Sequence, residues 1–296
     1  MNDRLTQLAL FVRTVETGSF SKTAREFGLA QPSVSRAIAA LEARLGVALL
    51  TRTTRRVATT EAGQALAVSA RDALAAIDDA ESAARGADRL TGVLRVALPT
   101  AFGVRQIVPR LPAFATLHPG LKIELMMSDR FEDLVAEGAD LALRLGDQPD
   151  SAFVARKLAS AARVVVASPD YLRRRGVPVV VAELAEHDCL GGPADANREL
   201  WMFTRNGKPE TIGVEPRVRT GSGAGVVACA VAGLGVATVS MWMCGEELQD
   251  GRLTRILPEY ALEPVDAYIV FPAGRRPSRK TKAFADALSA AFRAKA

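Results

Sequence analysis

The chain has 296 residues, of which 49% are hydrophobic, and it carries a formal net charge of +5. This length is sufficient for two or three domains with cores of their own, and the composition excludes a disordered chain. We expect a cytoplasmic protein without a membrane span, because the sequence contains neither an apolar export segment at its start nor a run of about eighteen apolar residues.

Residues 20–44 have the pattern of two short helices joined by a tight turn at Gly28-Leu29-Ala30. In the first helix Ser21 is expected to be the N-cap, and the residues spaced to pack inward are Phe20, Ala24 and Phe27. The second helix has Pro32 in its first turn, where a missing N–H is no loss. Its apolar stripe consists of Val34, Ile38, Leu41 and Leu45. Together the two helices predict a helix-turn-helix, for which duplex DNA is the first partner to consider.

The face of the second helix opposite the apolar stripe is polar. Its side chains have a size that can reach base edges or phosphates from the major groove, and they are Gln31, Ser33, Ser35 and Arg36. A helix of an ordinary core would not need such donors and acceptors there. The polar face therefore predicts sequence-specific binding and argues against an architectural DNA binder, which binds different sequences almost equally.

The flanking segments support the same interpretation. Upstream, apolar residues between Leu5 and Val15 recur at helical spacing and end at Gly18, which predicts the third helix of a small domain. Downstream, residues 49–60 are rich in Thr and Arg, as expected of a two-stranded wing along a phosphate backbone. Residues 1–62 contain nine Lys or Arg and five Asp or Glu, a surplus of four, so nearly all of the net charge of +5 lies there.

This segment resembles the N-terminal winged helix-turn-helix of the LysR-type transcriptional regulators. The resemblance rests on Gly18-Ser19-Phe20, Gln31-Pro32-Ser33-Val34-Ser35-Arg36, Leu41-Glu42 and Thr60-Glu61-Ala62-Gly63. It implies DNA contacts from the recognition helix and the wing, at Gln31, Pro32, Ser33, Ser35, Arg36, Arg52, Arg55 and Arg56. Ala30 departs from the family, which often has Ser or Thr there, so a side-chain cap is lost at this position.

Residues 61–90 are predicted to form a long linker helix, since residues 62–89 include eleven alanines. Its heptad seam consists of Leu66, Ala70, Ala73, Ile77, Ala80, Ala84 and Ala87. We expect this seam to dimerise the chain and to present two recognition helices to two half-sites. The alternative is a helix that lies on its own domain. The family resemblance implies an antiparallel linker-helix dimer, a homotetramer, and contact with RNA polymerase during activation.

From residue 91 onward, strand and helix patterns alternate, which indicates an α/β region. Strands are expected at residues 93–98, 121–127, 141–144, 163–167, 215–219, 235–239 and 267–271, and helices at about 103–117, 131–138, 224–232 and 278–293. Phrases such as Ser168-Pro169-Asp170-Tyr171-Leu172 resemble the effector-binding half of the same family, which implies the two-lobed fold of type 2 periplasmic binding proteins.

We therefore expect three parts in chain order. A winged helix-turn-helix DNA-binding domain occupies residues 1–60, a linker helix residues 61–90 and an effector-binding domain residues 91–296. Within the last, lobe I is expected at about 93–160 plus 267–296, and lobe II at about 162–266.

A two-lobed domain offers a small-molecule effector a cleft. Candidate effector-binding residues follow the expected strands and open helices, and they are Thr100, Ser128, Arg144, Thr220 and Ser222. Hydroxyl and N–H groups at helix starts can hold a carboxylate, and Arg144 adds a positive charge, so we expect a small anion. The resemblance implies that these places border the cleft. The alternative for each Ser or Thr is a helix cap.

Cys189, Cys229 and Cys244 are widely separated and form no CxxC motif, so we expect neither a disulfide framework nor a metal site, and we expect no cofactor. Buried inert thiols are the favoured interpretation. A redox- or pH-sensing regulator of the same fold, using Cys229 or Cys244, is the main alternative to a regulator with an organic effector.

An enzyme is not expected. The sequence contains no G-x-S-x-G, P-loop or HExxH motif. Its two histidines, His118 and His187, fall in a predicted turn and a predicted loop. We interpret both as surface or capping residues rather than as catalytic bases.

Overall fold

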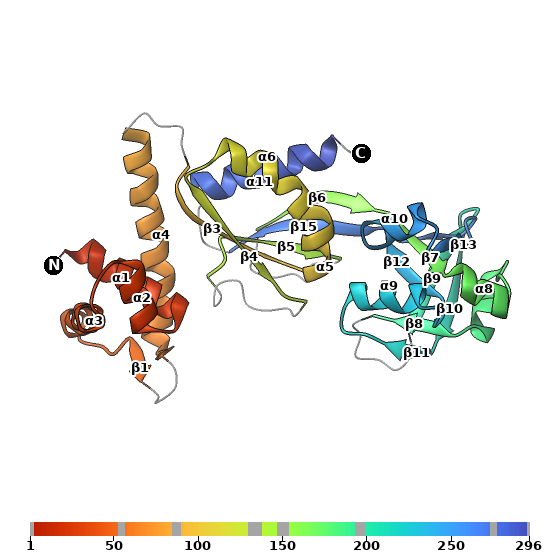
Figure 1. Cartoon of the computed structure of the whole chain (residues 1–296), viewed down its shortest axis with the longest axis horizontal. Coiled ribbons are helices and arrows are strands. Elements are labelled where there is room, and N and C mark those ends of the chain that lie inside the picture. Colours follow the sequence, from red (N-terminus) through yellow and green to blue (C-terminus); the bar gives the residue numbers. More distant parts are fainter. Residues whose placement is uncertain are drawn as a thin grey trace.

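The computed structural model describes residues 3–52, 57–84, 90–129, 138–146, 154–192, 199–272 and 277–294. Figure 1 shows an elongated chain, in which a helical N-terminal part, the long helix α4 and two α/β lobes follow one another along the longest axis. Among the described residues, no helix is long and apolar enough to cross a membrane.

The N-terminal part contains α1 (Arg4–Thr17), α2 (Phe20–Glu26), α3 (Gln31–Leu45), β1 (Leu50–Arg52) and β2 (Val57–Thr59). The two strands are antiparallel, with Thr51 opposite Ala58, which confirms the two-stranded wing. Apolar residues from all three helices form one core, whose fully buried members include Leu10, Phe11, Val34 and Leu41. α1 ends at Gly18, whose φ of 62° is a conformation that favours glycine.

Three predictions about these helices are wrong. The N-cap of α2 is Ser19 instead of Ser21, because Ser19 lies in extended backbone and its hydroxyl accepts a hydrogen bond from the Lys22 amide at 3.3 Å. Phe27 is 42% exposed because it follows the end of α2, and Leu45 is 41% exposed because it is the last residue of α3. Both residues continue the apolar spacing of their helix, but they lie at its C-terminal end, beyond the turns that pack on the core.

Helix α4 (Glu61–Ala84) confirms the predicted long helix as far as the structure describes it. In its first half, Ala67 and Ala70 are buried in the core of the N-terminal part. Farther along, the seam positions Ala73 and Ala80 are exposed. The first half of α4 therefore packs on its own domain, which was the alternative to a dimer seam. The second half leaves alanines exposed to solvent.

Lobe I is built on a five-stranded sheet with the order β4-β3-β5-β15-β6, in which β15 is antiparallel to both of its neighbours. The elements are β3 (Gly92–Leu98), α5 (Thr100–Phe102), α6 (Leu111–Leu117), β4 (Leu121–Met127), β5 (Leu141–Leu145), β6 (Val154–Ala161), β15 (Val265–Phe271) and α11 (Arg279–Arg293). α6 and α11 lie together against the sheet (Figure 1), where the rings of Phe114 and Phe284 meet edge to face at 5.2 Å.

The helix that was predicted over residues 103–117 is interrupted. A π-helical turn (Gly103–Ile107) and a 3-10 turn (Val108–Arg110) separate α5 from α6. Pro109 and Pro112 lack the N–H donor that a regular α-helix needs, so the hydrogen-bond ladder cannot continue through them. The chain stays helical through both turns but loses the regular α-helical hydrogen bonding.

Within the described residues, lobe II has small sheets with the orders β12-β7-β13, β10-β9-β14 and β11-β8. Its elements are β7 (Arg163–Ala167), α8 (Pro169–Arg175), a 3-10 helix (Val181–Glu186), β8 (Cys189–Gly191), β9 (Glu199–Arg205), β10 (Lys208–Val214), β11 (Pro216–Arg219), α9 (Gly223–Val231), β12 (Ala237–Ser240), α10 (Met241–Gln249), β13 (Thr254–Ile256) and β14 (Ala261–Leu262). The chain passes between the lobes from β6 to β7 and returns from β14 to β15.

The strands that were predicted between residues 93 and 271 are all present, with ends that differ by two residues or fewer. The helices predicted at 224–232 and 278–293 correspond to α9 and α11. The helix predicted at 131–138 lies almost entirely outside the described residues. Elements that were not predicted from the sequence are β6, β8, β9, β10, β13, β14, α8 and α10.

Candidate DNA-recognition surface and effector cleft

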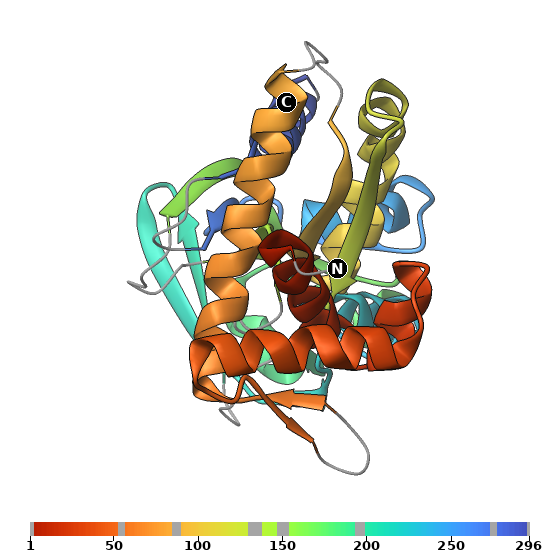
Figure 2. The same cartoon turned by 90° about the vertical axis from the view of Figure 1, so that its left-hand side faces the viewer.

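Helix α3 turns its polar face to solvent. Gln31, Pro32 and Arg36 are exposed, and Ser33 and Ser35 are half-buried. The apolar stripe on the other side fixes the helix on the core, so the polar face is the surface that remains for a ligand. In Figure 2, α3 lies across the end of the molecule that faces the viewer, with the wing strands below it.

The guanidinium of Arg36 is directed toward the start of α3. Its Nε donates to the carbonyl oxygen of Pro32 at 3.3 Å. The first turns of a recognition helix are the part that contacts base edges in helix-turn-helix proteins. The helix has no side-chain cap at Ala30, as expected. Pro32 has no N–H, and the amide of Ser33 donates to the carbonyl of Ala30 at 2.9 Å, so the start of α3 offers a ligand mainly side chains.

Glu42 fixes the wing to the recognition helix. Its Oε1 accepts hydrogen bonds from the amides of Leu49 and Leu50, at 2.8 and 3.1 Å. Because β1 begins at Leu50, a side chain of α3 determines where the wing starts. The predicted DNA contacts of the wing have side chains outside the described part of the structure, and they are Arg52, Arg55 and Arg56.

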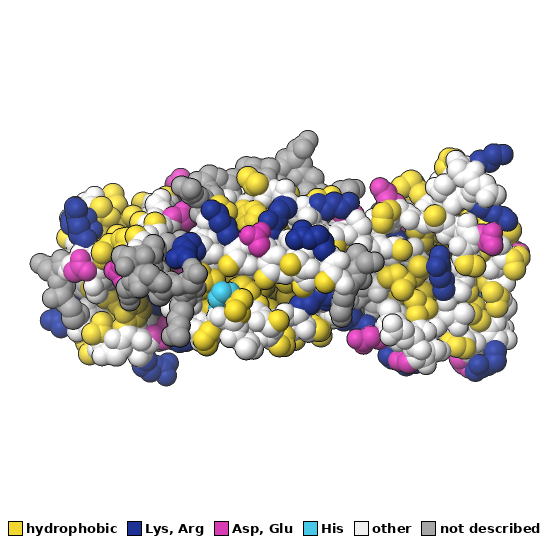
Figure 3. Space-filling view, turned by 90° about the horizontal axis from the view of Figure 1, so that it is seen from above, with side chains coloured by type: hydrophobic (Ala, Val, Ile, Leu, Met, Phe, Trp, Pro, Cys, Tyr) yellow, Lys and Arg dark blue, Asp and Glu magenta, His cyan; other side chains and the backbone are white. Residues whose placement is uncertain are grey.

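Positively charged side chains also occur far from the N-terminal part. Figure 3 shows Lys and Arg side chains over the middle of the molecule, where α6 and α11 lie. Acidic side chains pair with some arginines of lobe I, as Asp286 does with Arg156 at 2.8 Å. The N-terminal part differs in its net surplus of four positive charges, which attracts a polyanion such as DNA.

A cleft of about 520 Å³ lies between the two lobes. Lobe I contributes α5, the end of β5 and the start of β15, and lobe II contributes β12 and the starts of α9 and β9. The apolar part of the lining includes Phe102, Trp201 and Met243, and its charged residues are Asp129, Arg163 and Glu199. This size and mixture are typical of small-molecule sites.

The five candidate effector residues surround the cleft without being among its described lining residues. Four of them are next to a lining residue in the sequence. The lining residues adjacent to Thr100, Ser128, Arg144 and Ser222 are Ala101, Asp129, Leu145 and Gly223. Their role in effector binding stays a prediction.

The start of α5, proposed as an anion site, is occupied by the protein itself. The amide of Thr100 donates to the carboxylate of Asp129 at 2.8 Å. Ser128 donates its own amide to the carbonyl of Leu98 at 3.1 Å. Arg144 lies on β5, opposite Tyr268 of β15.

Thr220 and Ser222 have local partners at the start of α9. The hydroxyl of Ser222 accepts from the Gly225 amide at 3.2 Å, so Ser222 is the N-cap of the helix. The hydroxyl of Thr220 donates to the carbonyl of Ser222 at 2.7 Å. A Cβ at Gly225 would lie 2.8 Å from the Thr220 side chain. These contacts match the alternative interpretation, in which the two residues shape the helix start.

Arg163 is a charged lining residue that was not predicted from the sequence. It is the first residue of β7, it is exposed, and its guanidinium forms no ion pair with another described residue. The two acidic lining residues, in contrast, are engaged: Asp129 by the Thr100 amide and Glu199 by Arg219 at 2.8 Å. Among the described lining residues, Arg163 is therefore a cation without an ion-pair partner, while Asp129 keeps its negative charge because its partner is a neutral amide. The only feature of the sequence that could have indicated Arg163 is its position directly after the predicted crossing from lobe I to lobe II.

The cysteines differ in their access to solvent. Cys189 and Cys244 are buried, and burial raises their pKa to about 12 and about 11. Few of these thiols are ionised at neutral pH, which makes them inert toward oxidants. Cys229 lies half-buried on α9. Of the two redox candidates, Cys229 is the more accessible.

Both histidines have structural partners. His118 ends α6, and its ring packs on that of Phe114 with centroids 4.6 Å apart. Nδ1 of His187 lies 3.1 Å from the hydroxyl oxygen of Tyr171, and burial, helped by Arg175, lowers the pKa of this imidazole. In the part of the chain that the structure describes, no group of His, Cys, Asp and Glu could hold a metal ion.

Two family models together match most of the chain. Residues 5–64 match the bacterial regulatory helix-turn-helix protein, lysR family, and residues 87–293 match the LysR substrate binding domain. The protein therefore belongs to the LysR family of transcriptional regulators, with a DNA-binding helix-turn-helix followed by an effector-binding domain.

Relatives and solved structures extend over nearly the whole length. An uncharacterized HTH-type transcriptional regulator of Haemophilus influenzae is 33% identical over 274 residues, which are 92% of this chain and 95% of that protein. CrgA, a LysR-type transcriptional regulator from Neisseria meningitidis, has a structure with a TM-score of 0.62 and 30% identity, covering 97% of this chain and 98% of its own. The virulence activator AphB of Vibrio cholerae gives a TM-score of 0.59 and 28% identity over 97% and 98% of the two chains.

These comparisons confirm the predicted family and fold, a winged helix-turn-helix followed by a two-lobed domain. The curated relatives are named as transcriptional regulators. The protein is accordingly a regulator and not an enzyme.

Proposed function

We propose that this regulator binds specific operators through α3 and the wing, and that a small anion in the cleft between the lobes changes that binding. The exposed polar face of α3, backed by a buried apolar stripe, is the observation that carries the DNA part of the proposal. We assign residues 1–60 to DNA binding, 61–90 to the linker and 91–296 to the effector domain, with the lobe limits expected from the sequence.

In this proposal the protein acts as a homo-oligomer in the cytoplasm. The exposed alanines of α4, such as Ala73 and Ala80, support a dimer through the linker helix, because small side chains allow two helices to approach closely. A dimer would present two recognition helices to a pseudo-palindromic operator. We extend the proposal to a tetramer and to contact with RNA polymerase when the protein activates transcription.

The DNA part is tested by footprinting the full-length protein on fragmented genomic DNA of its host, at near-physiological salt. We expect a few pseudo-palindromic sites. Uniform coverage would contradict specific binding and favour an architectural role.

On an operator found in this way, Arg36→Ala should weaken specific binding by about 1–3 kcal/mol if Arg36 reads a base, and should mainly reduce the salt slope, by about one, if it contacts a phosphate. Arg44→Ala is a matched control, because Arg44 is exposed on the same helix about 12 Å farther along its axis. Equal affinity and equal salt slope of wild type and Arg36→Ala would contradict both roles of Arg36.

The effector part rests on the open positive charge of Arg163 in the cleft. Thermal unfolding of the full-length protein is measured with a panel of small carboxylates and with the corresponding neutral amides. A carboxylate at about 100 times its Kd should stabilise the protein by about 2.7 kcal/mol, whereas its amide should not. Arg163→Gln should abolish the effect, and Arg217→Gln, which removes an exposed arginine of β11, should retain it. Stabilisation by the amides, or an unchanged response of Arg163→Gln, would contradict an anionic effector held by Arg163.

A thiol-based sensor is the second candidate, and the half-buried position of Cys229 favours it. Solved structures of the AphB regulatory domain from Vibrio vulnificus include one treated with cumene hydroperoxide, which is 26% identical to this chain with a TM-score of 0.54. We expect Cys229→Ser to remove any response of operator binding to peroxide, with Cys244→Ser as the control. A peroxide response that survives in Cys229→Ser would exclude this sensor.

A further inference from the structure

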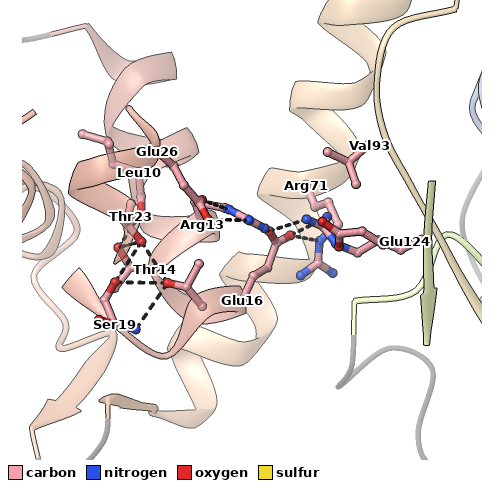
Figure 4. Close-up of polar contacts among 12 residues, drawn as sticks. Leu10, Arg13, Thr14, Glu16, Ser19, Thr23, Glu26, Arg71, Val93 and Glu124 are labelled. Carbon is pink, nitrogen blue, oxygen red and sulfur yellow. Dashed lines mark hydrogen bonds and ion pairs between the residues drawn. The ribbon is translucent and has the colours of Figure 1, made fainter. Parts of the chain in front are cut away.

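The carboxylate of Glu16, on α1, connects the DNA-binding part of the chain with lobe I. One of its oxygens accepts from Arg71 of α4 at 3.2 Å and from Arg95 of β3 at 3.1 Å. The other lies 3.0 Å from Nη2 of Arg95 and 3.0 Å from Nη1 of Arg13. Figure 4 shows Glu16 between α1, α4 and the strands of lobe I, so that one carboxylate is shared by three elements.

The surrounding charges balance one another. Arg95 also donates to Glu124 of β4 at 2.8 Å, and Arg13 donates to Glu26 of α2 at 3.0 Å. The side chains of Glu16 and Arg95 are only 10% and 13% exposed. A bidentate pair that is largely shielded and part of a network is stronger than an isolated pair on the surface.

In the described part of the chain, the two domains share no apolar core. The apolar core of the N-terminal part and the main core of the lobes have no described residue in common. Between α4 and lobe I lies a hollow of about 360 Å³, lined by Arg71, Asp140 and Ser278 among others. Polar, incompletely packed interfaces within one chain allow domains to move relative to one another. The orientation of the two domains therefore depends strongly on Glu16 and Arg95.

This contact leaves the recognition surface free. Gln31 and Arg36 of α3 are exposed while Glu16 is paired. The pair can thus orient the recognition helix but does not cover it. On the other side, Arg95 lies on the strand that leads to Pro99 in the lining of the cleft, a distance of about 13 Å at 3.3 Å per residue.

We propose that the Glu16–Arg95 pair is a charge latch, which fixes the orientation of the DNA-binding domain on lobe I and so couples the cleft to the recognition helix. This inference rests on the proposed function for its regulatory meaning. The existence of the latch itself requires neither DNA nor an effector.

Distances between two spin labels test the latch in the full-length protein. One label is placed on α3 at Ala40→Cys and the other on β4 at Lys122→Cys, both at exposed positions, in a Cys229→Ser background. An excess of unlabelled protein keeps the measured pairs within one chain. We expect a narrow distance distribution for the otherwise unchanged protein.

Arg95→Met removes the donors of the latch but leaves Glu16 its partners Arg13 and Arg71. We expect loss of the narrow distribution. The control Arg156→Met removes an arginine of lobe I that pairs with Asp286, and it should keep the distribution narrow. A narrow distribution in Arg95→Met would overturn the latch.

Should Arg95→Met fail to fold, Glu16→Gln tests the latch from the other side. This change removes the negative charge that Arg95 contacts and keeps the size of the side chain. We expect the distance distribution to broaden, and a narrow distribution in Glu16→Gln would overturn the latch. If no specific operator is found, the proposed function fails while these distances still decide on the latch.

Discussion

Replacing Arg105 by Met should destabilise the contact between the lobes. Arg105, on the π-helical turn of lobe I, donates to both carboxylate oxygens of Glu247 on α10, at 2.9 and 2.7 Å. The side chain of Glu247 is 5% exposed and that of Arg105 is 22% exposed. In Arg105→Met this buried carboxylate would keep Arg252, at 3.6 Å, as its ion-pair partner among the described residues.

The magnitude follows from the burial of the pair. Removing one member of a buried ion pair costs about 3–5 kcal/mol, and because Arg252 compensates in part, we expect a loss at the lower end, about 3 kcal/mol. For a domain of about 200 residues this corresponds to a fall in Tm of about 6–12 °C. Arg252→Met is the matched control: its side chain is half exposed, so its loss should cost less than about 1 kcal/mol.

The effect of Arg105→Met should also depend on pH. The hydrogen bonds from Arg105 lower the pKa of Glu247 from its ordinary value of 4.5. A carboxyl group whose pKa is lowered by folding contributes stability above its ordinary pKa, and this contribution disappears as the pH falls. The difference between wild type and Arg105→Met should therefore be largest at neutral pH and smaller at about pH 4. Urea unfolding followed by circular dichroism measures it at each pH. A difference that is independent of pH, or below about 1 kcal/mol at neutral pH, would refute the reasoning.

Three further substitutions test local packing, two next to the wing and one in lobe II. Gly63→Ala should lower the stability of the DNA-binding domain by about 1–3 kcal/mol or more, because the added Cβ would lie 2.0 Å from the carbonyl oxygen of Leu49; an unchanged Tm would contradict this close approach. Gly245→Ala, in α10 with no atom within 4 Å of its Cβ, should instead stabilise the protein by about 0.5–1 kcal/mol. Glu42→Ala removes two charge-assisted hydrogen bonds to the wing. We expect it to lower the free energy of unfolding by about 2–4 kcal/mol and to weaken operator binding. Retained affinity in a gel-shift titration would show that the wing does not need Glu42.

The parts of the fold that the sequence predicted best are those set by local signals. The recognition helix could be placed because Pro32 and the stripe from Val34 to Leu41 act within one helix. The hairpin of β9 and β10 was missed although its signal is also local. Its turn is Asn206-Gly207, with φ values of 51° and 74°, and an Asn-Gly pair between alternating segments is a strong hairpin signal.

The lining of the cleft could be predicted only approximately, because it depends on which ends of distant elements meet. Thr100 and Ser222 were correctly placed near helix starts, but their backbone and hydroxyl groups are used by Asp129 and by the amide of Gly225. No local pattern reports such a partner 29 residues away in the sequence. For the same reason Arg163, whose exposure in the cleft depends on both lobes, could not be distinguished from any other surface arginine.

Two charge pairs connect the parts of the protein: Glu16–Arg95 joins the DNA-binding domain to lobe I, and Arg105–Glu247 joins lobe I to lobe II. Together they give an effector in the cleft a physical route to the recognition helix. Arg105, paired across the lobes with Glu247, lies three residues after α5, whose Ala101 and Phe102 line the cleft. α5 in turn follows β3, which carries Arg95 and hence the latch to Glu16. A change in the angle between the lobes would thus move a continuous segment that ends at the DNA-binding domain. Coupling of this kind is reciprocal, because it is a difference in binding free energy between two arrangements. Operator DNA must therefore change the affinity of the cleft for its effector by the same factor by which the effector changes the affinity for DNA.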